Sequence, residues 1–429
     1  MIRPADHPAR LTLNDEIHAR PSEPLYGPTR LSYLAILSPP SARDEERACV
    51  TALCARFGSA APPPRGNHFS VDLGPLRLVW ERHSEFVRYT FIAPSNVPDV
   101  PWDEPPALSL VAADWLETLP GTVIVATHAL LTRNLGDREY GEIAAAMFEG
   151  NLLAGCEVAG GAAFACTDFR IHTDGFSRIL VDDRGLTSRQ AGRTLQRLLE
   201  IDTYRMMALL ALPVAQAAAP FLADCERELK EIANALVSTV AEDEPVLLER
   251  LTELEAAIAL RCGDNDFRFG AAAAYYELVN RRIAELREQR VPGLQTIGEF
   301  IERRLAPAMN TCRSIAARQD RISARAAGQT QLLSTRVALT RERQNQAILQ
   351  TMNRRADIQL RLQSTVEGLS VAAVTYYVVG LVAYGAKSAA AWGLKINIDL
   401  TVGISIPVVA FLVAMGLRRV HRLVMLQHS

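Results

Sequence analysis

Residues 368–386, GLSVAAVTYYVVGLVAYGA, and residues 400–417, LTVGISIPVVAFLVAMGL, decide the architecture of this chain. Neither stretch contains Asp, Glu, Lys, Arg or His. A helix rises about 1.5 Å per residue, so each stretch is long enough to cross roughly 30 Å of hydrocarbon. We therefore expect a transmembrane hairpin of two helices near the C-terminal end, with the lipid bilayer as its surroundings.

Glycines and a proline interrupt these apolar stretches. Gly380, Gly403 and Gly416 would allow helices to approach closely, and Pro407 breaks the regular helical hydrogen bonding. Proton- and ion-coupled pumps ordinarily carry ionisable groups inside the membrane, and these stretches have none. We predict that the four residues serve membrane packing, and a pore lining is the alternative.

Charge on either side of the hairpin predicts its orientation. Arginines lie at its outer ends: Arg354, Arg355, Arg361, Arg418, Arg419 and Arg422. The connecting loop, residues 387–399, carries two lysines and one aspartate. Because cytoplasmic flanks are enriched in Lys and Arg, we expect both termini in the cytoplasm and the loop outside. The first residues lack the apolar stretch of a signal peptide, which agrees with a cytoplasmic body.

Composition limits the remaining alternatives. A chain of 429 residues is too long for one ordinary core, so two or more compact units are expected. The net charge of -2 gives no general reason to expect binding to nucleic acid. The seven cysteines form no C-x-x-C pair, as is typical of free buried thiols in a reducing compartment.

The first part of the chain predicts an α+β domain over residues 1–185. Strands are expected wherever short runs alternate or are rich in β-branched and aromatic residues. These runs cover residues 31–37, 68–73, 76–83, 85–93 and 122–130, and residues 159–169, 169–174 and 176–183 supply two or three more strands. Helices are expected near residues 41–58 and 137–147, and the short connections between strands favour a largely antiparallel sheet.

Helical patterns follow from residue 186. Thr187 and Gln190 form the signature of a capping box, and Pro213 and Pro220 are expected to kink or end the first helix. Amphipathic helices follow, with a break at residues 291–293 and a weak coiled-coil pattern beyond it. The apolar run 206–223 is interpreted as a buried helix junction, with a membrane segment as the alternative.

The chain therefore divides into four parts. We expect a cytoplasmic α+β domain at 1–185, a helical bundle and stalk at 186–365, a transmembrane hairpin at 366–417 and a basic cytoplasmic tail at 418–429.

One candidate catalytic segment is TDFRIHTD, residues 167–174. On a strand, side chains alternate between faces, so Asp168, Arg170 and His172 would share one face. Histidine titrates near neutrality, so this row would suit acid–base chemistry. A solvated ladder on the outer face of a sheet is the structural alternative. The run WERH, residues 80–83, also alternates, with Glu81 and His83 opposite Trp80 and Arg82. A stack of Arg82 on Trp80 is one interpretation, and a polar strand edge is the interpretation we adopt.

A second polar cluster lies in LNDEIHARP, residues 13–21. Asp15, Glu16 and His18 are suitable metal ligands, and His18 is also a weak catalytic candidate. A capped turn whose carboxylates pair with arginines is the structural alternative. The chain contains no G-x-G-x-x-G, Walker A, H-E-x-x-H or G-x-S-x-G motif, so we expect no cofactor and have no motif that indicates an enzyme.

Three segments carry a resemblance to a known family: LNDEIHARP, residues 184–215 and residues 365–387. Together they resemble the bacterial DUF3422 family of uncharacterised, membrane-anchored proteins. The resemblance implies a soluble body, a C-terminal hairpin and a location in the bacterial inner membrane, and it assigns no role to any residue. The order of parts also resembles the CorA-type magnesium channels, but their Gly-Met-Asn is missing and residues 383–387 read AYGAK.

These observations leave three functional hypotheses. The first is a membrane-anchored protein that binds a cytoplasmic protein partner or assembles as a homo-oligomer. The second is an oligomeric CorA-like ion channel or transporter without Gly-Met-Asn. The third is a membrane-tethered enzyme that uses Asp168, Arg170 and His172, together with His18.

Overall fold

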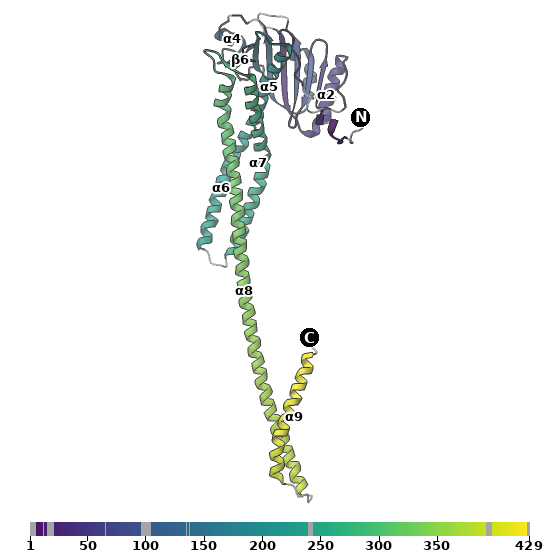
Figure 1. Ribbon diagram of the computed structural model, residues 1–429, viewed down its shortest axis with the longest axis vertical. Helices are drawn as coiled ribbons and strands as arrows, with labels where there is room; N and C mark the ends of the chain where they lie inside the picture. Colours follow the sequence, from purple (N-terminus) through teal and green to yellow (C-terminus); the bar gives the residue numbers. More distant parts are fainter. Residues whose placement is uncertain are drawn as a thin grey trace. The chain divides into compact units, whose positions relative to one another are not determined.

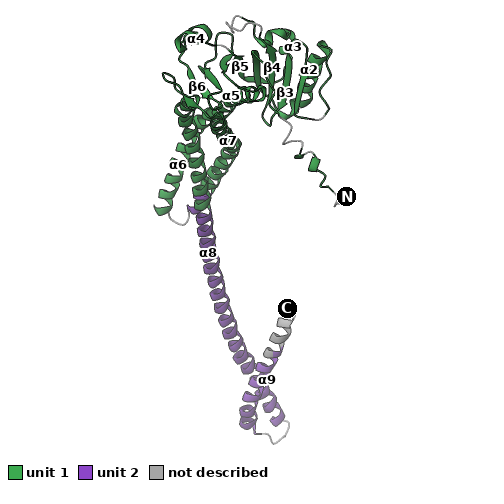
Figure 2. Ribbon diagram, turned by 45° about the horizontal axis from the view of Figure 1, so that its top comes forward, with its two compact units in different colours: residues 1–238, 249–330 green, residues 239–248, 331–429 purple. Residues whose placement is uncertain are grey.

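The computed structural model describes residues 6–11, 13–14, 21–64, 66–95, 104–133, 135–136, 138–238, 243–391 and 397–426 (Figure 1). Of residues 417, 418 and 420–426 it describes the backbone only. The chain divides into two compact units, one of residues 1–238 with 249–330 and one of residues 239–248 with 331–429 (Figure 2).

The first unit contains one nine-stranded sheet. Its strands are β1 (Thr29–Leu37), β2 (His68–Asp72), β3 (Arg77–Arg82), β4 (Phe86–Pro94), β5 (Thr122–Thr132), β6 (Ala154–Val158), β7 (Ala163–Thr167), β8 (Ser177–Asp183) and β9 (Gln289–Arg290). They lie in the order β2-β3-β4-β1-β5-β8-β7-β6-β9. Only β5 and β8 are parallel, and every other neighbouring pair is antiparallel. The predicted α+β domain with a largely antiparallel sheet is therefore confirmed.

Helices follow and interrupt the strands. They are η1 (Pro40–Ala42), α2 (Arg43–Arg56), η2 (Ala107–Leu110), α3 (Ala113–Leu116), α4 (Tyr140–Met147), α5 (Ser188–Leu209), α6 (Ala211–Ser238), α7 (Glu244–Leu286), α8 (Ile297–Ala391) and α9 (Ile398–Leu426).

Strand β1 lies inside the sheet and is buried on both faces. Tyr33 and Ala35 belong to the core cluster that contains α5, whereas Leu34 and Ile36 belong to the cluster that contains α2 and Trp115. Side chains alternate between the faces of a strand, so a strand covered on both sides needs a continuous apolar run. This explains why residues 31–37 read LSYLAIL.

The prediction of a strand over residues 169–174 was wrong. Strand β7 ends at Thr167 and β8 begins at Ser177, and the residues between them form a turn. Phe169 has φ 55° and Gly175 has φ 83°, backbone conformations that a strand does not contain. Strands β6 and β9 were not predicted, because β6 is a short run beside several glycines and β9 has only two residues.

Helix boundaries follow local chemistry where it is strong. The capping box of Thr187 and Gln190 at the start of α5 is confirmed, and α5 ends before Pro213. Proline clashes with the carbonyl four residues earlier, so a continuous helix through this position is unfavourable. Helix α7 continues without interruption through Gly263 and ends at Leu286, shortly before the predicted break at residues 291–293. Met207, Ala208, Ala211 and Ala215 lie in the core, so the apolar run 206–223 packs inside this unit.

The second unit contains the first residues of α7, the part of α8 from residue 331 onward, and the whole of α9. Glu244 of α7 pairs with Arg336 of α8 at 2.5 Å and accepts a hydrogen bond from Thr340 at 3.2 Å. Further along, α9 crosses the last turns of α8 (Figures 1 and 2). A groove of about 690 Å³ lies between these two helices, and Tyr376, Gly380 and Ile406 are among the residues that line it.

Candidate functional site

The turn between β7 and β8 brings two of the predicted catalytic residues together. Asp168 Oδ1 accepts a hydrogen bond from the backbone N–H of Arg170 at 3.1 Å, which turns the chain immediately after the strand. The backbone N–H of His172 donates to Phe176 O at 2.9 Å and closes the turn. These local bonds place the His172 ring beside the Asp168 carboxylate.

His172 lies between two carboxylates. Its Nε2 lies 3.0 Å from Asp168 Oδ2, and its Nδ1 lies 3.1 Å from Glu149 Oε1. Asn151 donates to the same Asp168 oxygen at 2.9 Å and fixes its position. Glu149, like Phe169, has a positive φ, of 53°, so both non-glycine turns that shape the site adopt an uncommon backbone conformation.

The cluster differs from the row that the sequence predicted. Arg170 contacts Asp168 only through its backbone N–H, and its side chain is exposed. Glu149 and Asn151 come from the α4–β6 connection, and no local pattern pointed to them. The His172 and Asp168 side chains are 0% exposed, so a substrate reaches the imidazole only if the turn opens. A catalytic role for Asp168, Arg170 and His172 stays a prediction.

The second polar cluster of the sequence, Asp15, Glu16 and His18, lies outside the described residues. Within the residues that the structure does describe, no group of three or more His, Cys, Asp or Glu side chains is arranged to hold a metal ion.

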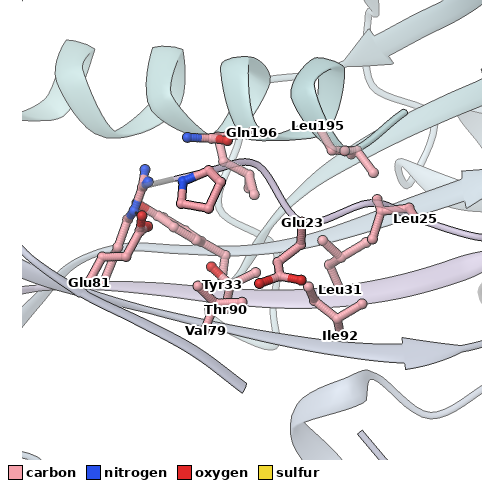
Figure 3. A pocket seen from close by; sticks show the side chains of 14 residues that line it. Glu23, Leu25, Leu31, Tyr33, Val79, Glu81, Thr90, Ile92, Leu195 and Gln196 are labelled. Carbon is pink, nitrogen blue, oxygen red and sulfur yellow. The ribbon is translucent and has the colours of Figure 1, made fainter. Parts of the chain in front are cut away.

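A cavity of about 50 Å³ lies between α5 and the sheet (Figure 3). Tyr33 and Glu81 rise from the strands below it, and Leu195 and Gln196 approach from α5 above it. Arg88 also lines this space, which has room for a few water molecules.

Residues 21–25, here called the strap, run across the mouth of this cavity. The backbone N–H of Leu25 donates to Ser188 O at 3.0 Å, and Glu23 pairs with Arg77 at 3.3 Å. The strap passes so close to α5 that a Cβ atom on Gly192 would lie 1.8 Å from Glu23 O. A glycine is therefore required at position 192 to hold the strap in place.

Buried charges beneath the strap join the sheet to the helices. Arg88 of β4 pairs with Glu81 of β3 and, at 3.2 Å, with Glu200 of α5, and all three side chains are 5% exposed. Arg282 of α7 also pairs with Glu200, and Gln196 donates to Glu200 at 2.8 Å. We call Arg88, Glu81, Glu200 and Arg282 the buried charge cluster.

Electrostatics favour the charged form of Arg88 in this cluster. Burial alone lowers the pKa of Arg88, but the charge and hydrogen bond of Glu81, with smaller contributions from Tyr33 and Glu200, outweigh it, so the pKa is raised. Burial raises the pKa of Tyr33, whose hydroxyl lies 2.8 Å from Thr203 Oγ1. Both groups therefore keep one protonation state near neutral pH, which suits a structural joint rather than proton transfer.

Sequence reasoning found only one member of the buried charge cluster, Glu81 in WERH, and interpreted it as a strand edge. In the sheet, β3 lies between β2 and β4 and Glu81 is 4% exposed. A usable signal was present in α5, where Glu200 interrupts the apolar run LLEI on the helix face that is buried.

The predicted membrane-packing residues lie in the second unit. A Cβ atom added to Gly380, Gly403 or Gly416 would meet nothing within 4 Å. Within this chain the glycines therefore do not bring α8 and α9 into close contact. Helix α9 continues through Pro407, which has no N–H to donate to the Gly403 carbonyl. A packing role for these residues against another molecule stays a prediction.

Comparisons with known proteins give one match. A family model described as protein of unknown function (DUF3422) matches residues 5–424. No curated protein and no solved structure matches the chain.

Proposed function

Because the chain belongs to the DUF3422 family, whose description gives no function, we propose a role from its own residues. The protein is anchored in the bacterial inner membrane by the last part of α8 and by α9, with both termini in the cytoplasm. Its α+β domain and helical bundle form a cytoplasmic body that binds a protein partner or self-associates.

One observation supports this proposal above all: the most apolar segments of α8 and α9 are almost entirely exposed in the protein. The most apolar window of α8 has a mean hydropathy of 1.7 with 6% of it buried, and that of α9 has 2.2 with 0% buried. A third apolar window, within residues 188–237, has a mean hydropathy of 1.8, but 33% of it is buried and it packs into the core. Only the first two therefore need a solvent other than water.

The exposed apolar side chains on α8 and α9 are large. Tyr376, Leu381 and Phe411 are 78%, 70% and 68% exposed. Burying one such side chain fully stabilises a protein by about 1.5–3 kcal/mol, so leaving many of them in water is strongly unfavourable. A bilayer removes that cost, and arginines on the outer flanks agree with the proposed orientation.

Extraction of membranes tests the anchor. The full-length protein is expected to stay in the pellet through high salt and alkaline carbonate, and to be released only by detergent. Phe411→Arg places a charge inside the proposed span at a cost of about 2.5–3.5 kcal/mol and is expected to increase the released fraction. Val246→Arg, at a 64% exposed site outside the proposed spans, is the matched control. Release of the unaltered protein by carbonate contradicts the proposal.

Self-association is supported by α8 before the membrane. Ile348, Met352, Ile358, Leu362 and Val366 are 57–66% exposed, and their spacing places them within one arc of the helix. Copies that share a membrane are parallel and locally concentrated, so the same arc of a second copy is the partner that fits. Arg355 and Gln359 interrupt the arc, which indicates a weak rather than an obligate contact.

Disulfide cross-linking in membranes tests this contact. Ile348→Cys is expected to form a covalent dimer on mild oxidation, whereas Gln350→Cys, on the opposite side of the helix, is expected to remain monomeric. Equal cross-linking of the two variants, or none, contradicts self-association along this arc. Native mass spectrometry in nanodiscs addresses the CorA-like alternative, because a monomer or dimer argues against a channel formed by a ring of subunits.

A further inference from the structure

We propose that a hollow at the start of α2 binds a phosphate-type oxyanion. The hollow has a volume of about 320 Å³ and is lined by Pro40, Arg43, Asn67, Arg82, His83 and Ser84. It lies at the end of β3, away from the residues discussed above as catalytic candidates. A phosphate group, free or as part of a small ester, fits its size and its chemistry.

The composition of the lining carries the inference. Among the described lining residues there are two guanidinium groups, an imidazole, an amide and a hydroxyl, and there is no carboxylate. All of these groups are able to donate hydrogen bonds, and charge-assisted bonds from arginine to phosphate are among the strongest in proteins. A pocket lined by two guanidinium groups and other donors, without a lining carboxylate, favours an oxygen-rich anion even though Glu46 balances the charge of Arg82 from behind.

The arginines are held in place by the fold. Arg82 is 8% exposed, pairs with the fully buried Glu46 and donates to Pro39 O at 3.2 Å. Glu46 does not line the hollow, so it fixes the guanidinium without entering the site. Arg43 is exposed and donates to Asn67 Oδ1, which directs the carbonyl end of that amide toward Arg43.

Two backbone features bring the remaining groups to the same place. The N–H of Arg82 donates to Asn67 O at 2.7 Å, and the N–H of His83 donates to Phe86 O at 2.8 Å and closes the β3–β4 turn. Arg43 is the first residue of α2, a helix of 14 residues, so the positive end of the helix dipole adds to the field. Asp44 and Glu45 also lie on this first turn, but both are exposed and neither lines the hollow.

Calorimetric titration of the full-length protein in detergent with inorganic phosphate tests the proposal. Saturable binding is expected, and chloride at matched ionic strength is expected to give none. Arg43→Gln removes an exposed donor and is expected to weaken phosphate binding about tenfold, the effect of losing one charge-assisted hydrogen bond. Arg43→Lys keeps the charge and is expected to retain most of the affinity.

The matched control is Arg56→Gln on the same helix. Arg56 pairs with Asp114 at 2.7 Å and lies outside the hollow, so this variant is expected to bind phosphate like the unaltered protein. Fluorescence of the buried Trp80 confirms that each variant is folded. No saturable binding to the unaltered protein, equal loss in both variants, or binding of acetate but not phosphate overturns the proposal. Because this experiment does not depend on the membrane anchor, its failure leaves the proposed function standing.

Discussion

Arg88→Met removes the positive charge at the centre of the buried charge cluster and leaves a shorter, unbranched apolar side chain. Glu81 and Glu200 are each 5% exposed, so neither regains water when the guanidinium is lost. Glu200 keeps its ion pair with Arg282. Among the described residues, Arg88 is the only arginine that forms an ion pair with Glu81, so Glu81 is left without one. Removing one partner of a buried ion pair typically destabilises a protein by about 3–5 kcal/mol, and we expect a loss in this range.

The assay is thermal unfolding of the full-length protein in detergent. Trp80 and Trp115 are each 1% exposed and report on the α+β domain. A loss of this size lowers the Tm by about 4–7 °C for a unit of this length. The double variant Arg88→Met with Glu81→Gln removes the unpaired charge, and we expect it to regain about 2 kcal/mol.

The matched control is Arg77→Met on β3, on the same face of the sheet as Glu81 and Arg88. Arg77 is 44% exposed and pairs with Asp72 at 3.5 Å and with Glu23 of the strap at 3.3 Å. Because these are surface ion pairs, its loss is expected to change stability by less than about 1 kcal/mol. If Arg88→Met is as stable as Arg77→Met, the cluster is solvated and does not join the sheet to the helices.

Two further predictions concern the strap and a buried histidine. Gly192→Ala forces Glu23 away from α5, so we expect a loss of stability of about 1–3 kcal/mol and faster proteolysis of the strap. Gly185→Ala, where a Cβ atom meets nothing within 4 Å, is the control and is expected to leave the rate of cleavage unchanged. Equal cleavage of the two variants would show that Gly192 does not hold the strap in place. Burial, opposed by Asp174 and assisted by Arg178, lowers the pKa of His128 from 6.5 to about 4. As the pH falls, the histidine of the unfolded chain takes up a proton before that of the folded protein, so about 2–3 kcal/mol of stability present above pH 6.5 is lost by about pH 4. Unfolding measured at a series of pH values is expected to show a weaker pH dependence of stability for His128→Gln. An unchanged pH dependence of stability in this variant contradicts the assignment to His128.

The fold was predictable where the sequence pattern is local. The run LSYLAIL predicts a strand because its apolar side chains serve two cores, and the capping box at Thr187 predicts the start of α5 because its hydrogen bonds lie within four residues. The turn after β7 was mistaken for a strand because alternating residues in FRIHTD imitate a pleat. The turn arises from Asp168 and Gly175, whose backbone effects outweigh the alternation.

The site was predictable only in part, because its contacts join distant segments. Asp168 and His172 are four residues apart and were found, but Glu149 and Asn151 belong to another loop. The buried charge cluster joins two strands and two helices, and Arg88 and Arg282 are separated by more than half of the unit's sequence. Local patterns do not contain that information, since pairing between such segments is decided by the packed sheet and bundle.

The central claim is that residues at the end of α8 and in α9 cross a membrane twice. Labelling of intact cells with a membrane-impermeant maleimide tests it, because the seven native cysteines are buried and give little background. We predict that the Ser388→Cys variant is labelled from outside, and that the Ser364→Cys variant is labelled only after the membrane is permeabilised. Labelling of Ser364→Cys in intact cells, or protection of Ser388→Cys until permeabilisation, would contradict the account.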